Sequence, residues 1–180
     1  WNCMASDGTQ NNFATDNRSF SLKLDVDDDG VPFENDTIIG YDSWVNSIGV
    51  NNLIGEVGGA STNGTIFGSH NLLFYDGVDL LINMSHDFST NSRIYLDNIS
   101  LIKTSSSIIL NLSNQMLPRE KKSMYLHDFE NKNFTNLCIK DAEINSEVEI
   151  STLCDQQFEL DFKNCIGNNE TVYVGGASCD

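Results

Sequence analysis

The sequence predicts an all-β protein, an antiparallel jelly-roll-like β-sandwich followed by a small disulfide-stapled C-terminal region. Three observations favour this fold class. Several segments alternate apolar and polar residues with the period of two that is typical of half-buried strands. An Asp-Gly pair separates two strand-like runs, as in a β-hairpin. Four of the five cysteines fall in the last 43 residues, beside further short strand-like runs.

Residues 19–25 form the first alternating segment, with Phe20, Leu22 and Leu24 on one side. They predict a half-buried strand that runs directly into an aspartate-rich loop. A second strand is expected over residues 37–41, after the loop.

Residues 72–75 and 78–85 flank Asp76-Gly77 and predict a hairpin with a type I′ turn. We expect the second strand to point Val78, Leu80, Ile82 and Met84 inward and Asp79, Leu81, Asn83 and Ser85 outward. A strand over residues 93–103 should change phase near Asp97-Asn98. In the next strand the apolar residues Ile108, Leu110 and Leu112 should face the core, with Asn111 outward.

Pro118 opens the most densely charged run of the chain, residues 118–122, and is the best candidate boundary. We expect a β-sandwich with the aspartate-rich loop over residues 1–117. Residues 118–180 would form a cysteine-rich β region that can pack with the sandwich as one unit.

The formal net charge is −16, with only 10 lysines and arginines. Such a field repels nucleic acid, so we exclude DNA and RNA as partners. No run approaches the roughly 18 consecutive apolar residues that a transmembrane helix needs, so no membrane span is expected. A hydrophobic share of 39% is enough for a packed core.

The chain contains eight N-x-Ser/Thr sequons, more than chance gives for this composition. Their excess predicts N-linked glycans and an extracellular or cell-surface location. The chain begins at Trp1 without a signal-peptide pattern, which indicates export processing or a fragment. The sequon asparagines are Asn17, Asn35, Asn63, Asn83, Asn98, Asn111, Asn133 and Asn169.

Cys138, Cys154, Cys165 and Cys179 are spaced by sixteen, eleven and fourteen residues, without a C-x-x-C pair. This spacing favours disulfides over a zinc or redox site. The simplest pairing is Cys138–Cys154 and Cys165–Cys179, although four cysteines allow three pairings. Cys3 is the odd cysteine, available for an intermolecular bond, for no bond, or for a partner in the tail.

Residues 25–36 place aspartates at positions one, three, five and twelve, with Gly30 at position six. Hard oxygen ligands at alternating positions and a glycine at the sharp turn predict a calcium loop. The aspartate at position twelve resembles the loops of dockerins and of thrombospondin type-3 repeats, which are extracellular calcium-binding modules. The resemblance implies coordination by Asp25, Asp27, Asp29, the carbonyl of Val31, and Asp36, with Asp28 facing outward.

No nucleophile elbow, phosphate loop or dinucleotide fingerprint occurs, so we do not expect an enzyme. His70, His86 and His127 are scattered and read as ordinary histidines. Acidic pairs for glycoside hydrolysis can be drawn from Glu56, Asp76, Asp79 and Asp97, but a chain this acidic supplies such pairs by chance.

The dense sequons and tail cysteines resemble heavily N-glycosylated prokaryotic, especially archaeal, cell-surface and extracellular-filament proteins. This resemblance implies a structural subunit of a filament or surface layer that self-associates into a homopolymer through its chain ends or edge strands. A calcium-dependent carbohydrate-binding module or adhesin, with a glycan ligand, is the alternative, and a secreted glycoside hydrolase domain the third. The calcium ion expected in residues 25–36 would fix one strand-to-strand connection and make the sandwich more rigid.

Overall fold

A computed structural model describes residues 4–6, 8–9, 11–13, 23–62, 65–90, 93–112, 121–126, 137–140, 142–162, 172–174 and 177–179. The chain in these ranges is built of strands and single turns of 3-10 helix, which confirms the all-β prediction. No helix in the described part is long and apolar enough to cross a membrane. The strands are β1 (Met4–Ser6), β2 (Asn11–Phe13), β3 (Ile38–Ile39), β4 (Asn46–Ile48), β5 (Leu53–Val57), β6 (Ala60–Ser61), β7 (Ser69–Asp76), β8 (Asp79–Asp87), β9 (Ile94–Tyr95), β10 (Ser100–Lys103), β11 (Ile108–Asn111), β12 (Lys122–Met124), β13 (Cys138–Lys140), β14 (Glu159–Asp161), β15 (Val172–Val174) and β16 (Ala177–Cys179). The 3-10 turns are η1 (Asp42–Trp44), η2 (Phe88–Thr90), η3 (Leu96–Asn98) and η4 (Glu147–Glu149).

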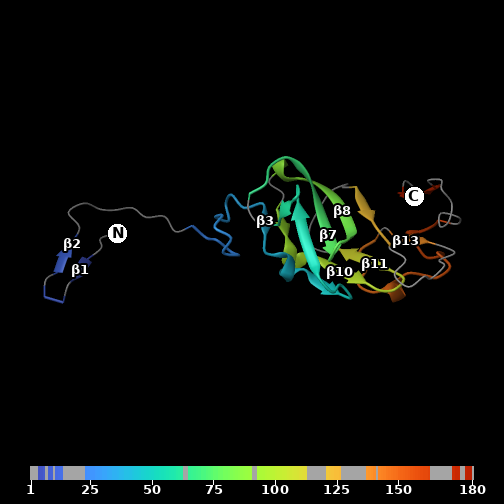
Figure 1. Cartoon of the computed structure of the whole chain (residues 1–180), viewed down its shortest axis with the longest axis horizontal. Helices are drawn as coiled ribbons and strands as arrows, with labels where there is room; N and C mark the ends of the chain where they lie inside the picture. The colour runs from blue at the N-terminus through green and yellow to red at the C-terminus, as the bar shows by residue number, and fades with distance from the viewer. Residues whose placement is uncertain are drawn as a thin grey trace.

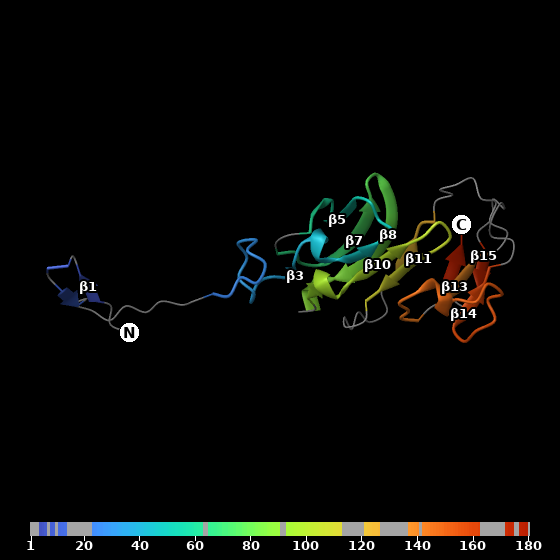
Figure 2. The ribbon, with the colours of Figure 1, turned by 90° about the horizontal axis from the view of Figure 1, so that it is seen from below.

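Two sheets face each other across one hydrophobic core (Figures 1 and 2). The larger sheet has the order β12-β8-β7-β5-β6 and is antiparallel throughout; the smaller has the order β11-β10-β4. Two pairings are parallel, β4 with β10 and β3 with β9, which the expected antiparallel arrangement did not include. The core takes Leu72, Phe74 and Met84 from the larger sheet and Leu101 and Leu112 from the smaller sheet and its end.

The β7–β8 hairpin is present, but its turn lies one residue later than predicted. Asp76 pairs with Asp79, so the loop residues are Gly77 and Val78, and Val78, predicted to face inward, is 94% exposed because it lies in the turn. Gly77 has a φ of +64° and Val78 has no positive φ, which fits a type II′ turn rather than type I′. A β-bulge then shifts the register, and Leu81, predicted to face outward, is completely buried beside Ile82.

The segment before the aspartate-rich loop differs from the prediction. Residues 19–22 lie outside the described ranges, and residues 23–25 are not in a strand. Leu24, expected to face a core, is 65% exposed; its carbonyl accepts a hydrogen bond from the Phe33 backbone N–H, so the residue closes the loop and does not extend a strand. The second predicted strand is the two-residue β3, which ends at Gly40 with a φ of +102°.

The strand predicted over residues 93–103 is interrupted where its phase was expected to change. It consists of β9 and β10, with η3 at Leu96–Asn98 between them. Ile108, Leu110 and Leu112 all pack on the core, as predicted. The opposite face of this sheet is not open to solvent, however, since Ile109 is 2% and Asn111 4% exposed.

The C-terminal region covers that opposite face. The Leu112 backbone N–H donates to Glu143 Oε2 at 2.9 Å, and the Asn111 amide donates to residues 144 and 145. At the other end of the β10–β11 hairpin, the Thr104 and Ser107 hydroxyls donate to Glu147 Oε2 at 3.1 and 3.3 Å. The tail is therefore a third layer on the sandwich. Pro118, the predicted boundary, lies outside the described residues.

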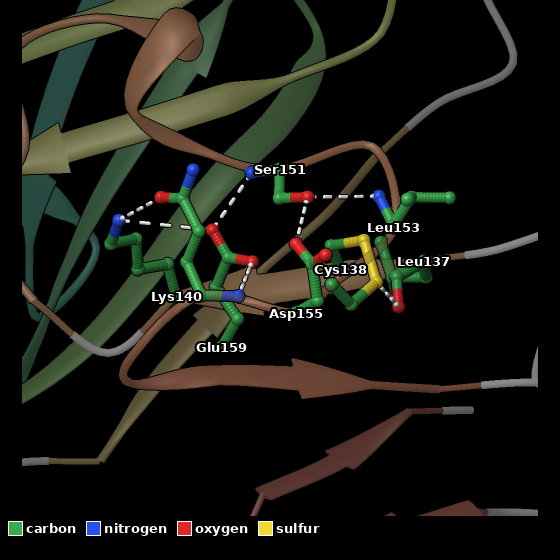
Figure 3. Close-up of a disulfide and its surroundings, with 9 residues drawn as sticks. Leu137, Cys138, Lys140, Ser151, Leu153, Asp155 and Glu159 are labelled. Carbon is green, nitrogen blue, oxygen red and sulfur yellow. Dashed lines mark hydrogen bonds and ion pairs between the residues drawn. A yellow bond between two sulfur atoms is a disulfide. The ribbon is translucent and has the colours of Figure 1, made fainter.

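The predicted Cys138–Cys154 disulfide is present and joins β13 to the loop before β14 (Figure 3). Beside it, Glu159 accepts the backbone N–H groups of Ser151 and Gln156 at 2.8 and 3.0 Å. Lys140 bridges from β13 to the Gln156 side chain at 3.2 Å. Cys179 is also disulfide-bonded, to a partner outside the described residues, where both Cys3 and Cys165 lie.

Asp76 joins the two sheets through an ion pair. Its Oδ2 lies 2.5 Å from Lys103 Nζ of β10, and both side chains are about nine-tenths buried. Its Oδ1 accepts the backbone N–H groups of Asn51 and Asn52. Burial raises the pKa of the Asp76 carboxyl. Lys103 and the two N–H groups together lower this pKa by more than burial raises it, so it lies below the usual value.

We expect Asp76→Asn to lower the free energy of unfolding by about 3 kcal/mol, because it leaves the Lys103 ammonium buried without its counter-charge. A carboxyl whose pKa is lowered on folding stabilises the protein above its unfolded pKa, about 3.9. That contribution should be lost as the pH falls through the lower, folded pKa. Urea titrations of D76N and the wild type at pH 7 and pH 3 test this. The difference between their free energies of unfolding should be smaller at pH 3 than at pH 7.

Asp79→Asn is the matched control, since it removes a carboxylate from the other end of the same turn without touching Lys103. An equal loss in D79N and D76N at pH 7 would contradict a specific role for the ion pair.

Candidate metal centre

The aspartate-rich loop folds back on itself through its own carboxylates. The Gly30 backbone N–H donates to Asp25 Oδ2 at 3.0 Å, and the Val31 N–H donates to Asp29 Oδ1 at 2.7 Å. Gly30 has a φ of +92° and Asp28 a φ of +57°. Glycine adopts such values without strain, and aspartate is among the few other residues that tolerate them. The sequence thus supports the turn at both positions where the backbone reverses.

Asp25, Asp27 and Asp29 converge as predicted. Each offers one carboxylate oxygen, and these oxygens all lie within 4.8 Å of one another. Two oxygens that bind one calcium ion at about 2.4 Å lie at most about 4.8 Å apart, so the cluster has the dimensions of a calcium site. Asp28 is exposed and lies outside the cluster, as the loop resemblance implied.

Two oxygens of this cluster are buried without a hydrogen bond. Asp27 is only 4% exposed, and its Oδ1 has no partner, nor has Oδ1 of Asp25. A buried carboxylate oxygen without a donor is strongly destabilising unless a cation compensates it. A cation would compensate these oxygens, and the all-oxygen donor set of the cluster suits a hard divalent cation such as Ca²⁺.

Asp36, the residue at position twelve, lies next to the cluster. It is 2% exposed, and its Oδ1 accepts the Ile38 backbone N–H at 3.0 Å. The pKa of Asp36 is raised to about 6, mainly by burial and also by the charges of Asp27, Asp29 and Asp25, while the hydrogen bond from the Ile38 N–H opposes this rise. Val31 uses its N–H within the loop, which leaves its carbonyl as the group that it could offer to a metal.

The sandwich anchors the loop at Asp27. Oδ2 of Asp27 accepts the Gly40 backbone N–H at 2.5 Å, and its carbonyl accepts the Tyr41 hydroxyl at 2.5 Å. Gly40 is required there, because a Cβ at this position would lie 2.6 Å from the Trp44 ring. One aspartate is thus held by backbone and side chain at the end of β3.

Arg93 anchors the other half of the loop. Its guanidinium donates to the carbonyls of Asp36 and Phe33 at 3.0 and 3.1 Å and lies 4.4 Å from the Phe33 ring centroid. The nearby Lys23 pairs with Glu34 at 3.1 Å. The contacts of both cations are therefore with carbonyls and with Glu34, while Oδ1 of Asp25 and Oδ1 of Asp27 have no hydrogen-bond partner. Arg93 lies 57 residues from Asp36, and no local pattern predicted its role.

The other predicted residues are distributed over the molecule. Asn35 is exposed, Asn83 and Asn98 are half-buried, and Asn111 is buried, contrary to the expected outward position; Asn17, Asn63, Asn133 and Asn169 lie outside the described ranges. Among the carboxylates considered for hydrolysis, Asp76 is held by Lys103, Glu56 forms a hydrogen bond with Tyr75, and Asp97 lines a separate polar pocket. His70 and His86 are cross-strand partners, and His127 lies outside the described residues.

We expect Asp27→Asn to have different effects on stability with and without calcium. Without calcium, D27N removes one of the three clustered acidic groups and keeps an oxygen for Gly40, so its melting temperature should equal or exceed that of the wild type. At calcium concentrations of 100 Kd the wild type should gain about 2.7 kcal/mol, whereas D27N should gain little. Thermal unfolding with chelator and with calcium measures both effects.

Asp28→Asn is the control for this comparison, because it removes a neighbouring charge outside the cluster. Equal calcium-induced stabilisation of D27N and the wild type would contradict the site.

Arg93→Lys should lower calcium affinity by about 10-fold, as is usual when a residue that orients the ligand loop is lost. The substitution keeps the positive charge but loses the fork that holds two carbonyls at once. Isothermal titration gives the affinity, and Lys23→Met reports the effect of removing a positive charge nearby. If R93K binds calcium as the wild type does, Arg93 does not position the loop.

No model of a protein family, no curated protein and no solved structure matches this chain. The role of the loop must therefore be derived from its own chemistry. The loop has three convergent carboxylates, two buried oxygens without hydrogen bonds, and anchors on both sides through Asp27 and Arg93.

Proposed function

We propose that the chain is a calcium-stabilised structural subunit of an extracellular, glycosylated filament or surface layer. The observation that carries the calcium part is the cluster of Asp25, Asp27 and Asp29, with its buried and unpaired oxygens. Residues 25–36 would hold the ion, with Asp36 and the Val31 carbonyl completing the ligands. When bound, the ion supplies charge compensation and cross-linking.

The position of the loop indicates what the ion would stabilise. Asp25 belongs to the segment that enters from the N-terminal side, whereas Asp36 directly precedes β3, whose Ile38 is fully buried in the core. An ion that bridges Asp25 and Asp36 would fix the N-terminal segment on the sandwich. In its absence, the like charges of the loop favour opening of that connection.

The N-terminal segment is suited to association between copies. Residues 19–25 have the alternation of a strand, yet Leu24 is 65% and the nearby Val26 44% exposed. β1 and β2 pair with each other and with no other described strand, and Figures 1 and 2 draw this hairpin away from the sandwich. A segment with the alternation of a strand and exposed apolar side chains can pair with the sheet edge of a neighbouring subunit.

The full chain tests this proposal in light scattering and electron microscopy, with calcium and with chelator. We expect concentration-dependent multimers with calcium and fewer with chelator, because the ion fixes the segment that associates. Leu24→Ser should reduce multimer formation and leave calcium binding intact. Val78→Ser is the matched control, since Val78 is 94% exposed in the β7–β8 turn, remote in sequence from the loop.

A chain that binds calcium but stays monomeric at every concentration would refute the filament and keep the metal site. A chain that neither binds calcium nor assembles would refute both.

Carbohydrate binding is the second candidate, and one contact favours it. Tyr41 and Trp44 form an edge-to-face pair with centroids 6.0 Å apart beside Asp27, and Trp44 is 39% exposed. An exposed indole beside a calcium site can stack on a sugar ring. Retention on a glycan array that chelator and Trp44→Ala both abolish would favour this role over the structural one.

A further inference from the structure

Two sequons meet on the face of the smaller sheet that the tail covers. Ser100, which completes the Asn98 sequon, lies opposite Asn111 of β11 on one side and opposite Asn46 of β4 on the other. A polar pocket of about 250 Å³ opens over this row, lined by Asn46, Asp97, Asn98, Ile99, Ser100, Asn111 and Asn145. Residues from the sheet and from the tail therefore share one polar cavity.

Asn111 contributes its amide to the docking of the tail. Its Nδ2 donates to the Ile144 carbonyl at 3.1 Å and to Oδ1 of Asn145 at 2.8 Å. The two acceptors match the two hydrogens that a primary amide nitrogen has. The side chain is 4% exposed, and Ile144, which covers it, is 6% exposed.

Asn98 has the opposite environment in the same pocket. It is half-buried, at the C-terminal end of η3, and its amide forms no hydrogen bond with any described residue. The Asn35 and Asn83 amides are likewise unbonded in the described part of the chain, and both are accessible. Among the four described sequons, Asn111 alone combines burial with a fully used amide nitrogen.

N-glycosylation has a defined chemical requirement at this nitrogen. An oligosaccharide is transferred from a lipid-linked phosphate donor: a bond forms between Nδ2 and the anomeric carbon, the bond from that carbon to the phosphate oxygen breaks, and one amide hydrogen leaves as a proton. The modified nitrogen retains one hydrogen. It can no longer donate to both Ile144 and Asn145, and the sugar needs the volume that the tail occupies.

We infer that Asn98 carries the glycan of this face and that Asn111 is a structural amide. Asn111 can be glycosylated or can hold the tail through its two hydrogen bonds, but not both. The inference rests on the glycosylated, extracellular character of the proposed function. The pocket leaves room beside Asn98 for the first sugar, between the sheet and Asn145. A polar floor of Asn46, Ser100 and Asp97 offers that sugar hydrogen bonds.

Further contacts hold the tail against Asn111. Glu143 accepts the Leu112 N–H, and Lys140 bonds the carbonyl of Glu149, so the segment between them is fixed at both ends. The Cys138–Cys154 disulfide closes the same region. Loss of the Glu143 and Asn145 acceptors should release the segment and expose Asn111.

The test uses the full chain secreted from a host that attaches N-glycans, with site occupancy mapped by peptide mass spectrometry. In the disulfide-bonded wild type we expect a glycan on Asn98 and none on Asn111. In E143A/N145A we expect occupancy at Asn111 to rise towards that at Asn98. Ser113→Ala, which destroys the Asn111 sequon and keeps its amide, should leave tail docking unchanged, as judged by hydrogen exchange of residues 142–150.

Two results would overturn the inference: a glycan on Asn111 in molecules whose residues 142–150 remain protected, or an empty Asn98 in chains glycosylated at Asn35 or Asn83. Chains without any glycan would also overturn it. Calcium titration of the same sample then shows whether the metal part of the proposed function survives independently.

Discussion

Burial of the Asp27 carboxylate is the constraint on which the N-terminal half of the structure depends. Its Oδ2 and its carbonyl are bonded to the end of β3, so the side chain cannot turn to solvent. Its Oδ1 is therefore fixed in a buried position without a donor, next to three further acidic groups. Ten acidic residues lie before position 60, so this carboxylate is buried in a part of the chain that is already rich in negative charge. A cation turns the same arrangement from a source of repulsion into a cross-link.

The tail is also joined to the sandwich through polar side chains, an amide and carboxylates. Asn111 and Glu143 are polar, yet they connect the outer face of β11 to the C-terminal layer. Apolar burial accompanies these bonds, since Ile109 and Ile144 are both nearly inaccessible. Hydrogen bonds fix the register of such a contact, while the apolar pair supplies most of the free energy. Polar residues that look like surface groups in the sequence thus act as joints between layers.

Local patterns predicted the parts of the structure that local physics determines. The hairpin at Gly77, the break at η3, the core positions of β11 and the Cys138–Cys154 pair follow from alternation, turn chemistry and short loop closure. The aspartate spacing predicted the cluster for the same reason, because its ligands lie within one turn of chain. The bulge that buries Leu81, the parallel pairs and the cover over Asn111 depend on contacts between distant segments. No periodicity within one strand contains that information.

The two junctions differ in how they respond to their surroundings, and this difference bears on assembly. The aspartate loop joins the N-terminal segment to β3 through charges, so its strength depends on cation concentration and ionic strength. At the tail, the Asn111 bonds join uncharged groups, and Glu143 and Glu147 accept from uncharged N–H and O–H donors, so these bonds contain no pair of opposite charges for salt to screen. In the proposed subunit, calcium would therefore change the order of the N-terminal segment and leave the tail unchanged. That segment also carries the exposed Leu24 and Val26, so metal binding would act on the surface proposed to contact the next subunit.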